Sequence, residues 1–188
     1  MVFAGASKLK NLADVYFDVG PDGRLLFRNS KGQVEIFDPR DKKTETHDTL
    51  HPSALSESLR WSPDGQSIAY VVPASREGDA AAGLWVDDFK GAPRQVFRGW
   101  VYAYARGPHD EIYLIEGKPD LNGVLWKLGW NGQGLGQTST IIRMIDSYWV
   151  EPGQNSGDDF GVSPDGRHLA FDLQTVLGAN FGMIENVR

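Results

Sequence analysis

The sequence predicts an all-β fold in which one small antiparallel sheet is repeated about four times. A turn motif of the type Gly/Ser-Pro-Asp-Gly recurs along the chain, and a short apolar run follows each copy. The 22 glycines among 188 residues are consistent with many tight turns between short strands. With 40% apolar residues, the chain can bury a core of ordinary size.

The repeated turn lies at residues 20–23, 62–65, 107–110 and 163–166. Proline presets φ, aspartate accepts hydrogen bonds from nearby amides, and glycine adopts the positive φ that a tight hairpin requires. The third residues of the four copies are separated by 42, 45 and 56 positions. The first two spacings match the ~40–45 residues of a four-stranded propeller blade, and the third matches a blade with an insertion. We therefore predict a β-propeller with about four blade-like units.

The units are expected at residues 14–50, 55–98, 99–142 and 157–188 of a single domain. In each unit an inner strand precedes the turn, and apolar second and third strands follow it. Polar, β-branched stretches at 44–46, 94–97 and 138–142 are the expected outer strands. The last unit ends after its third strand, so we expect either residues 1–10 or a second copy of the chain to complete its sheet.

Composition excludes several classes of function. The 19 Lys and Arg against 25 Asp and Glu give a net charge of −6, which argues against a nucleic-acid partner. Without cysteine the chain has no disulfide, thiolate nucleophile or Cys-ligated metal. No apolar run approaches the ~18–20 residues of a membrane helix, and the first residues lack the apolar core of a signal peptide. We expect no membrane insertion, no export signal and no cofactor; the compartment is left open.

Residues 59–70 and 160–171, each with a Ser-Pro-Asp-Gly turn before an apolar strand, resemble the repeats of TolB-like, WD-repeat-like bacterial β-propellers. Residues 20–37 share the pattern, and the third copy departs from it with His109-Asp110 in place of Asp-Gly. The stretch 181–188 resembles the end of propellers appended to bacterial serine/threonine kinase-like or transcriptional-regulator proteins. The resemblance implies a platform for recognition of proteins or ligands, often periplasmic or extracytoplasmic. Some relatives cap peptidase domains, and a few are lyases or hydrolases.

Large and charged side chains near the expected inner strands are the first group of candidate ligand-binding residues. Inner strands of a propeller line the central channel or pack against a neighbouring blade. Aromatic and arginine side chains are common anchors of interfaces, but a propeller also needs large residues between its blades, and both interpretations remain open. The group comprises Arg60, Trp61, Trp100, Tyr102, Tyr104, Arg106 and, in the third turn, His109.

The insertion before the fourth turn supplies the second group, because binding residues concentrate on loops of a rigid scaffold. Residues 143–188 carry three arginines against seven carboxylates, which favours a basic partner or a cation. The alternative is packing of the aromatic residues between blades, with solvated carboxylates. The candidates are Trp149, Glu151, Asn155, Asp158 and Asp159.

Catalytic and metal-binding motifs receive structural explanations. His47 and His51 have the spacing of a metalloprotease helix, but the β-type residues before them and Pro52 after them predict an extended chain, so we predict no metal site. Ser62 and Ser163 belong to the repeated turns, and no catalytic residue is predicted. The expected function is noncatalytic recognition of a protein or peptide. Two alternatives remain: a small hydrolase or lyase with an axial pocket using His109, His168 or the Glu151/Asp158/Asp159 group, and a homo-oligomerising partial propeller.

Overall fold

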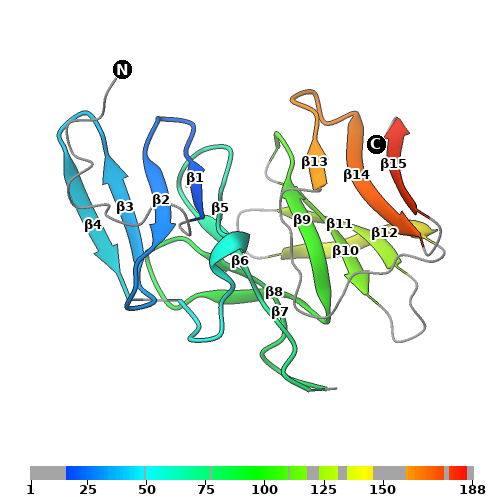
Figure 1. Ribbon diagram of the computed structural model, residues 1–188, viewed down its shortest axis with the longest axis horizontal. Coiled ribbons are helices and arrows are strands. Elements are labelled where there is room, and N and C mark those ends of the chain that lie inside the picture. The colour runs from blue at the N-terminus through cyan, green and yellow to red at the C-terminus, as the bar shows by residue number, and fades with distance from the viewer. Residues whose placement is uncertain are drawn as a thin grey trace.

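The computed structural model describes residues 16–48, 50–76, 78–109, 111–117, 123–130, 135–145, 160–175 and 178–185. The regular secondary structure of these residues is β-strand, apart from one 3-10 turn, η3 (Ser56–Ser58), before the second sheet. Four separate antiparallel sheets follow one another in an arc (Figure 1). The predicted all-β propeller-type fold is confirmed.

Each sheet is an antiparallel meander whose strands pair in chain order, and we call the sheets blades 1 to 4. The first strands of neighbouring blades lie side by side, β1 against β5 and β9 against β13, so they form the inner edges of the blades (Figure 1). In the described part of the chain blade 4 has three strands. The strands are β1 (Phe17–Val19), β2 (Leu25–Arg28), β3 (Val34–Asp38) and β4 (Lys43–His47); β5 (Arg60–Trp61), β6 (Ile68–Val72), β7 (Gly83–Asp87) and β8 (Arg94–Arg98); β9 (Val101–Arg106), β10 (Ile112–Gly117), β11 (Gly123–Trp130) and β12 (Leu135–Ile145); and β13 (Phe160–Val162), β14 (His168–Thr175) and β15 (Gly178–Glu185).

The repeated turns join the first and second strands with the geometry that the sequence predicts. Gly23, Gly65 and Gly166 have φ values of +84°, +67° and +68°. In blade 2, Asp64 Oδ1 accepts hydrogen bonds from the Gln66 amide at 2.9 Å and from the Ser62 hydroxyl at 2.6 Å. The same two bonds recur in blade 4. The turn residues are therefore explained by hairpin closure.

In the third turn, which lacks the usual aspartate, a different residue provides the carboxylate. Glu111 Oε2 accepts the amide hydrogen of His109 at 2.8 Å, and the Glu111 side chain lies across Gly107. A β-carbon at Gly107 would lie 2.7 Å from Cδ of Glu111, so the glycine leaves the space that this side chain fills. A glutamate two residues after the usual aspartate position thus supplies the carboxylate of this turn. It binds the amide of the third turn residue, whereas the aspartates of the other turns bind the amide of the fifth.

The core lies between the blades, because the second strands of the two central blades, β6 and β10, bury both of their faces. All five residues of β6 are buried. Ile68 and Tyr70 pack against blade 1, whereas Ala69 and Val71 pack against blade 3. This explains why the sequence shows short continuous apolar runs here instead of the polar-apolar alternation of a sheet with one wet face.

Gly83, at the start of β7, provides a test of the sheet geometry. Its φ is +146°, and an added β-carbon would lie 1.9 Å from the carbonyl oxygen of Phe97 on β8. We expect Gly83→Ala to lower the free energy of unfolding by at least about 2 kcal/mol, measured by urea denaturation. Gly91→Ala is the matched control, because nothing lies within 4 Å of its added carbon. Equal losses in both variants would contradict the geometry.

Candidate functional site

Three of the inner-strand candidates lie in the core between blades. Trp61, Tyr102 and Tyr104 expose 5%, 6% and 2% of their surface. Trp61 packs between blades 1 and 2, Tyr104 between blades 2 and 3, and Tyr102 between blades 3 and 4. Each side chain therefore holds two blades together, in agreement with the packing interpretation of these residues.

Tyr102 and Tyr104 face different blades although they are two positions apart on β9. Simple alternation along a strand would place both on one face. The pairing of β9 with β10 shifts register between Ile115 and Glu116, and this bulge turns Tyr102 to the side of blade 4. Its ring lies over Gly117, where an added β-carbon would come within 2.1 Å of the ring.

The Tyr104 hydroxyl links β9, the inner strand of blade 3, to the segment that precedes β5 of blade 2. Its Oη donates a hydrogen bond to the carbonyl oxygen of Ser58 in η3 at 2.6 Å. The hydroxyl oxygen of Ser58 in turn accepts the amide hydrogen of Val71 on β6 at 2.8 Å. Burial raises the pKa of Tyr104, so the phenol remains a neutral hydrogen-bond donor at neutral pH.

The remaining inner-strand candidates are half-buried and engage neighbouring groups. The Arg60 guanidinium donates to the carbonyl oxygen of Leu59 at 2.8 Å, and Arg106 donates to the hydroxyl oxygen of Ser67 at 3.3 Å. The Trp100 ring centroid lies 5.4 Å from that of Tyr102. Arg106, like the tyrosines, therefore joins blade 3 to a neighbouring blade.

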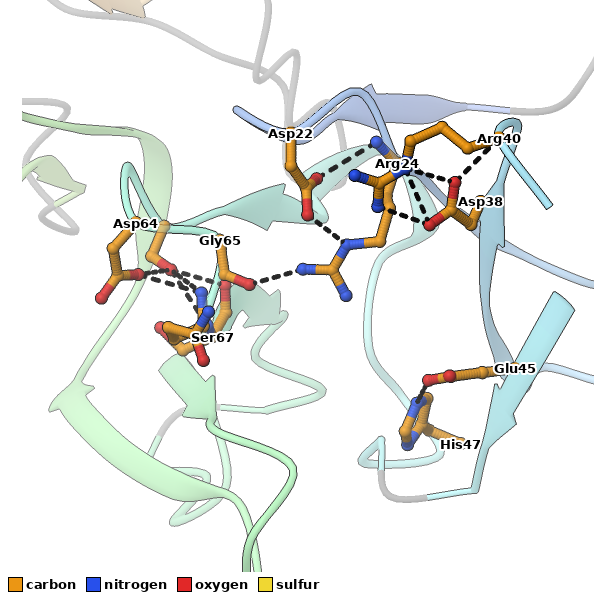
Figure 2. A network of polar contacts seen from close by, with 11 residues as sticks. Asp22, Arg24, Asp38, Arg40, Glu45, His47, Asp64, Gly65 and Ser67 are labelled. Carbon is orange, nitrogen blue, oxygen red and sulfur yellow. Dashed lines mark hydrogen bonds and ion pairs between the residues drawn. The ribbon is translucent and has the colours of Figure 1, made fainter. Parts of the chain in front are cut away.

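Polar contacts that the sequence analysis did not identify fasten blade 1 to blade 2. Asp18 Oδ2 on β1 accepts the backbone amide hydrogen of Trp61 at 2.7 Å. Arg24 pairs with Asp22 at 2.7 Å and donates to the carbonyl oxygen of Gly65 at 2.9 Å (Figure 2). Its guanidinium also lies 4.8 Å from the ring centroid of Trp61. The sequence signal for this contact is an arginine placed directly after the first turn, but its target on blade 2 is not visible in the sequence.

Arg40 repeats the local pairing without the contact to blade 2. It forms an ion pair with Asp38 at 2.5 Å, again two residues earlier in the chain (Figure 2). The side-chain hydrogen bonds from Arg40 lower the pKa of Asp38 to about 2. Asp38 and Arg40 thus form a surface pair within one blade.

The histidines do not converge on one site. His109 is exposed in the third turn, and His168 Nδ1 lies 3.8 Å from Asp165 in the fourth. His47 ends β4 with its ring 4.6 Å from that of Phe89, whereas the His51 ring lies 5.8 Å from Trp85. Across the described residues no group of three or more His, Asp or Glu side chains is placed to hold a metal ion.

Several predicted features lie outside the described residues. These are the possible closing strand at 1–10 and the candidates Trp149, Glu151, Asn155, Asp158 and Asp159, which stay predictions. In the ranges that the structure does describe, no helix has both the length and the apolar character needed to cross a membrane.

An exposed apolar face on blade 1 was not anticipated from the sequence. Phe17 and Val19 on β1 expose 59% and 54% of their surface. They pair in register with Phe27 and Leu25 on β2, and Leu25 pairs with Phe37 on β3. We call these five residues the outer face of blade 1, because the opposite side of the same sheet packs on blade 2. The alternating apolar residues at 17, 19, 25, 27 and 37 are its sequence signal.

The Arg24 contacts predict unequal effects of two similar substitutions. Arg24→Ala removes the hydrogen bond to Gly65 and the stacking on Trp61, so we expect a loss of about 1–2 kcal/mol in the free energy of unfolding, measured by urea denaturation. Arg40→Ala removes an exposed pair within one blade and should leave the urea midpoint nearly unchanged. If the two variants lost the same stability, the contact between blades would not contribute.

A hydrogen-bonded carboxylate in the loop before β7, that of Asp79, should make the stability of the fold depend on pH. The Ser75 hydroxyl donates to Asp79 Oδ2 at 2.6 Å, which with two backbone amides lowers the pKa of Asp79 to about 2. Because this value lies below the ordinary 3.8, the contribution to stability is present at neutral pH and is lost as pH falls from about 3.8 to 2. Ser75→Ala should raise the pKa of Asp79 towards 3.8 in an NMR titration of carboxyl carbons. Asp38, held by Arg40, is the internal control and should not move.

Comparisons with known proteins support the fold. Neither a protein-family model nor a curated protein sequence matches the chain. Among solved structures, TolB from Acinetobacter baumannii is similar with a TM-score of 0.59 and 16% identity, over 92% of this chain and 40% of that one. A WD40-type chain in the mitotic checkpoint complex gives a TM-score of 0.54 and 20% identity, over 91% of this chain and 48% of that one.

The structure of the Dos1 propeller gives a TM-score of 0.52 and 11% identity, over 93% of this chain and 48% of that one. The chain thus spans less than half the length of these three matches. They do not show the expected resemblance to propellers of kinase-like or regulator proteins. Because identities this low carry the fold alone, the conclusion is that this chain has the β-propeller fold of TolB-like and WD-repeat-like proteins.

Proposed function

We propose that the chain is a noncatalytic propeller module that recognises a protein or peptide partner. The observation that carries this proposal is the outer face of blade 1. In the described part of the chain, the exposed large apolar side chains are Tyr16, Phe17 and Val19, and the last two belong to this face. Contiguous apolar surface of this kind is typical of interaction sites, because it is released from water when a partner covers it.

Among the described residues, the titratable groups with shifted pKa values support recognition over an axial-pocket hydrolase or lyase; the Glu151/Asp158/Asp159 group lies outside them. Asp64 and Asp165 have lowered pKa values because the serine hydroxyls of their own turns bond to them. Burial raises the pKa of Tyr70 to about 12. These shifts accompany hairpin closure and core packing, whereas a catalytic site brings perturbed groups together in one concave pocket.

Charge and fold support a basic protein partner. Residues 143–188 carry three arginines against seven carboxylates, so a positively charged partner is attracted to this part of the chain. One of the similar propellers was solved within a protein complex, the mitotic checkpoint complex. We therefore propose a partner that combines apolar side chains for the outer face of blade 1 with basic residues.

Peptide display on the immobilised full chain tests the proposal. Selected peptides should bind the wild-type chain at nanomolar chain concentration, measured by fluorescence anisotropy. Phe17→Asp should raise their Kd at least tenfold, because the contact would then bury a carboxylate against apolar groups. Tyr16→Asp is the matched control: Tyr16 is 56% exposed, but strand alternation places it on the side of Asp18, which faces blade 2. Peptides that bind both variants equally, or a library that yields no binder, would refute recognition by this face.

A further inference from the structure

We infer that the outer face of blade 1 docks against blade 4 of a second copy of this chain, so that two copies close one ring of eight blades. This inference rests on the proposed function in that it uses the same apolar face. The partner that it names, a second copy with a net charge of −6, differs from the basic partner proposed above. Three observations carry it: the register of the inner strands, the burial of the second strands and the small exposed residues of blade 4.

The inner strands place equivalent residues at one register position in three blades. Phe17 pairs with Phe27, Tyr104 with Leu114, and Phe160 with Phe171. Tyr104 and Phe160 face the preceding blade and expose 2% and 5% of their surface, whereas Phe17 exposes 59%. Blade 1 therefore presents at this position the kind of side chain that the other blades bury against a neighbour.

The second strands repeat the same difference. The first residue of each second strand's apolar run faces the preceding blade, and Ile68, Ile112 and Leu169 are at most 1% exposed there. Leu25, at the equivalent position of β2, is only half-buried. The outer face of blade 1 thus continues the pattern of the three existing blade interfaces, but no described blade covers it.

Blade 4 has the complementary surface. The middle residue of the second strand faces the following blade, and Leu26, Ala69 and Tyr113 are fully buried there. Ala170 is the equivalent residue of β14, and it is exposed together with its pairing partner Gly161 on β13. Such small residues leave room for the phenyl rings of a blade 1 outer face. In the interface between blades 2 and 3, Ala69 is a small residue of this kind, and it lies in the same buried cluster as Tyr104.

Symmetry favours a second copy as the occupant. This chain matches 40–48% of the length of each of the three similar chains, so its four blades correspond to part of one such chain. A contact between blade 1 of one copy and blade 4 of the other is made twice around a two-fold axis. The ring then closes, and no apolar face is left for further chains to add to.

The solution mass of the full chain is the first test. Light scattering after size exclusion at about 50 µM should give twice the 20.8 kDa of one chain. Phe17→Asp and Ala170→Arg should each halve this mass, because they place charge on the two sides of the contact. Both positions are exposed in the single chain, so circular dichroism should show unchanged folding. Tyr16→Asp is the matched control and should keep the double mass.

Mixing the two variants tests the direction of the contact. The Phe17→Asp copy keeps a native blade 4, and the Ala170→Arg copy keeps a native blade 1, so one of the two contacts forms again. The mixture should recover a measurable fraction of the double mass, which neither variant gives alone. A dimer built from two blade 1 faces predicts the opposite: Ala170→Arg stays dimeric, and mixing restores nothing.

The inference is overturned if the wild-type chain has the mass of one copy, or if both substitutions leave the double mass intact. A monomer whose selected peptides still depend on Phe17 would leave the proposed recognition function standing and remove self-association alone. A dimer that follows the variant pattern but selects no peptide would support self-association and refute recognition of other partners.

Discussion

Burial of both faces of the second strand in the two central blades, β6 and β10, is the constraint from which the rest of the structure follows. A two-sided apolar strand such as β6 cannot be stable in a sheet with one wet face, so blades 2 and 3 each require a neighbour on either side. The large side chains of the inner strands fill the space between neighbouring blades. This is why Trp61, Tyr102 and Tyr104, attractive as ligand anchors in the sequence, lie between blades.

Hydrogen bonds of polar side chains set how neighbouring blades are oriented relative to one another. Tyr104 bonds to the Ser58 carbonyl, Asp18 to the Trp61 amide, and Arg24 to the Gly65 carbonyl. Each of the three contacts joins a side chain of one blade to the backbone of another segment. Backbone acceptors and donors do not change when side chains vary, so such contacts hold neighbouring blades at a fixed angle through changes in the core residues.

The sequence was sufficient for the local structure and insufficient for what depends on neighbouring blades. Turn positions and apolar runs follow from local chemistry, so the hairpins could be predicted from proline, aspartate and glycine. The bulge at Ile115 and Glu116 could not, because it arises from pairing between strands and leaves no mark at Tyr102. The exposure of Phe17 could not be predicted either, because an apolar residue of a strand fits the same sequence periodicity whether or not another blade covers it.

The third turn bears on how repeats of this type are counted. Glu111 supplies from the far end of the hairpin the carboxylate that aspartate supplies elsewhere, and Gly107 makes the room for it. What is preserved between blades is thus a carboxylate bonded to a backbone amide of the turn, while the residue that provides it and the amide that it binds both differ in the third blade. A search based on residue identity would find three blades here, whereas a search for any carboxylate bonded to an amide of the turn would find four.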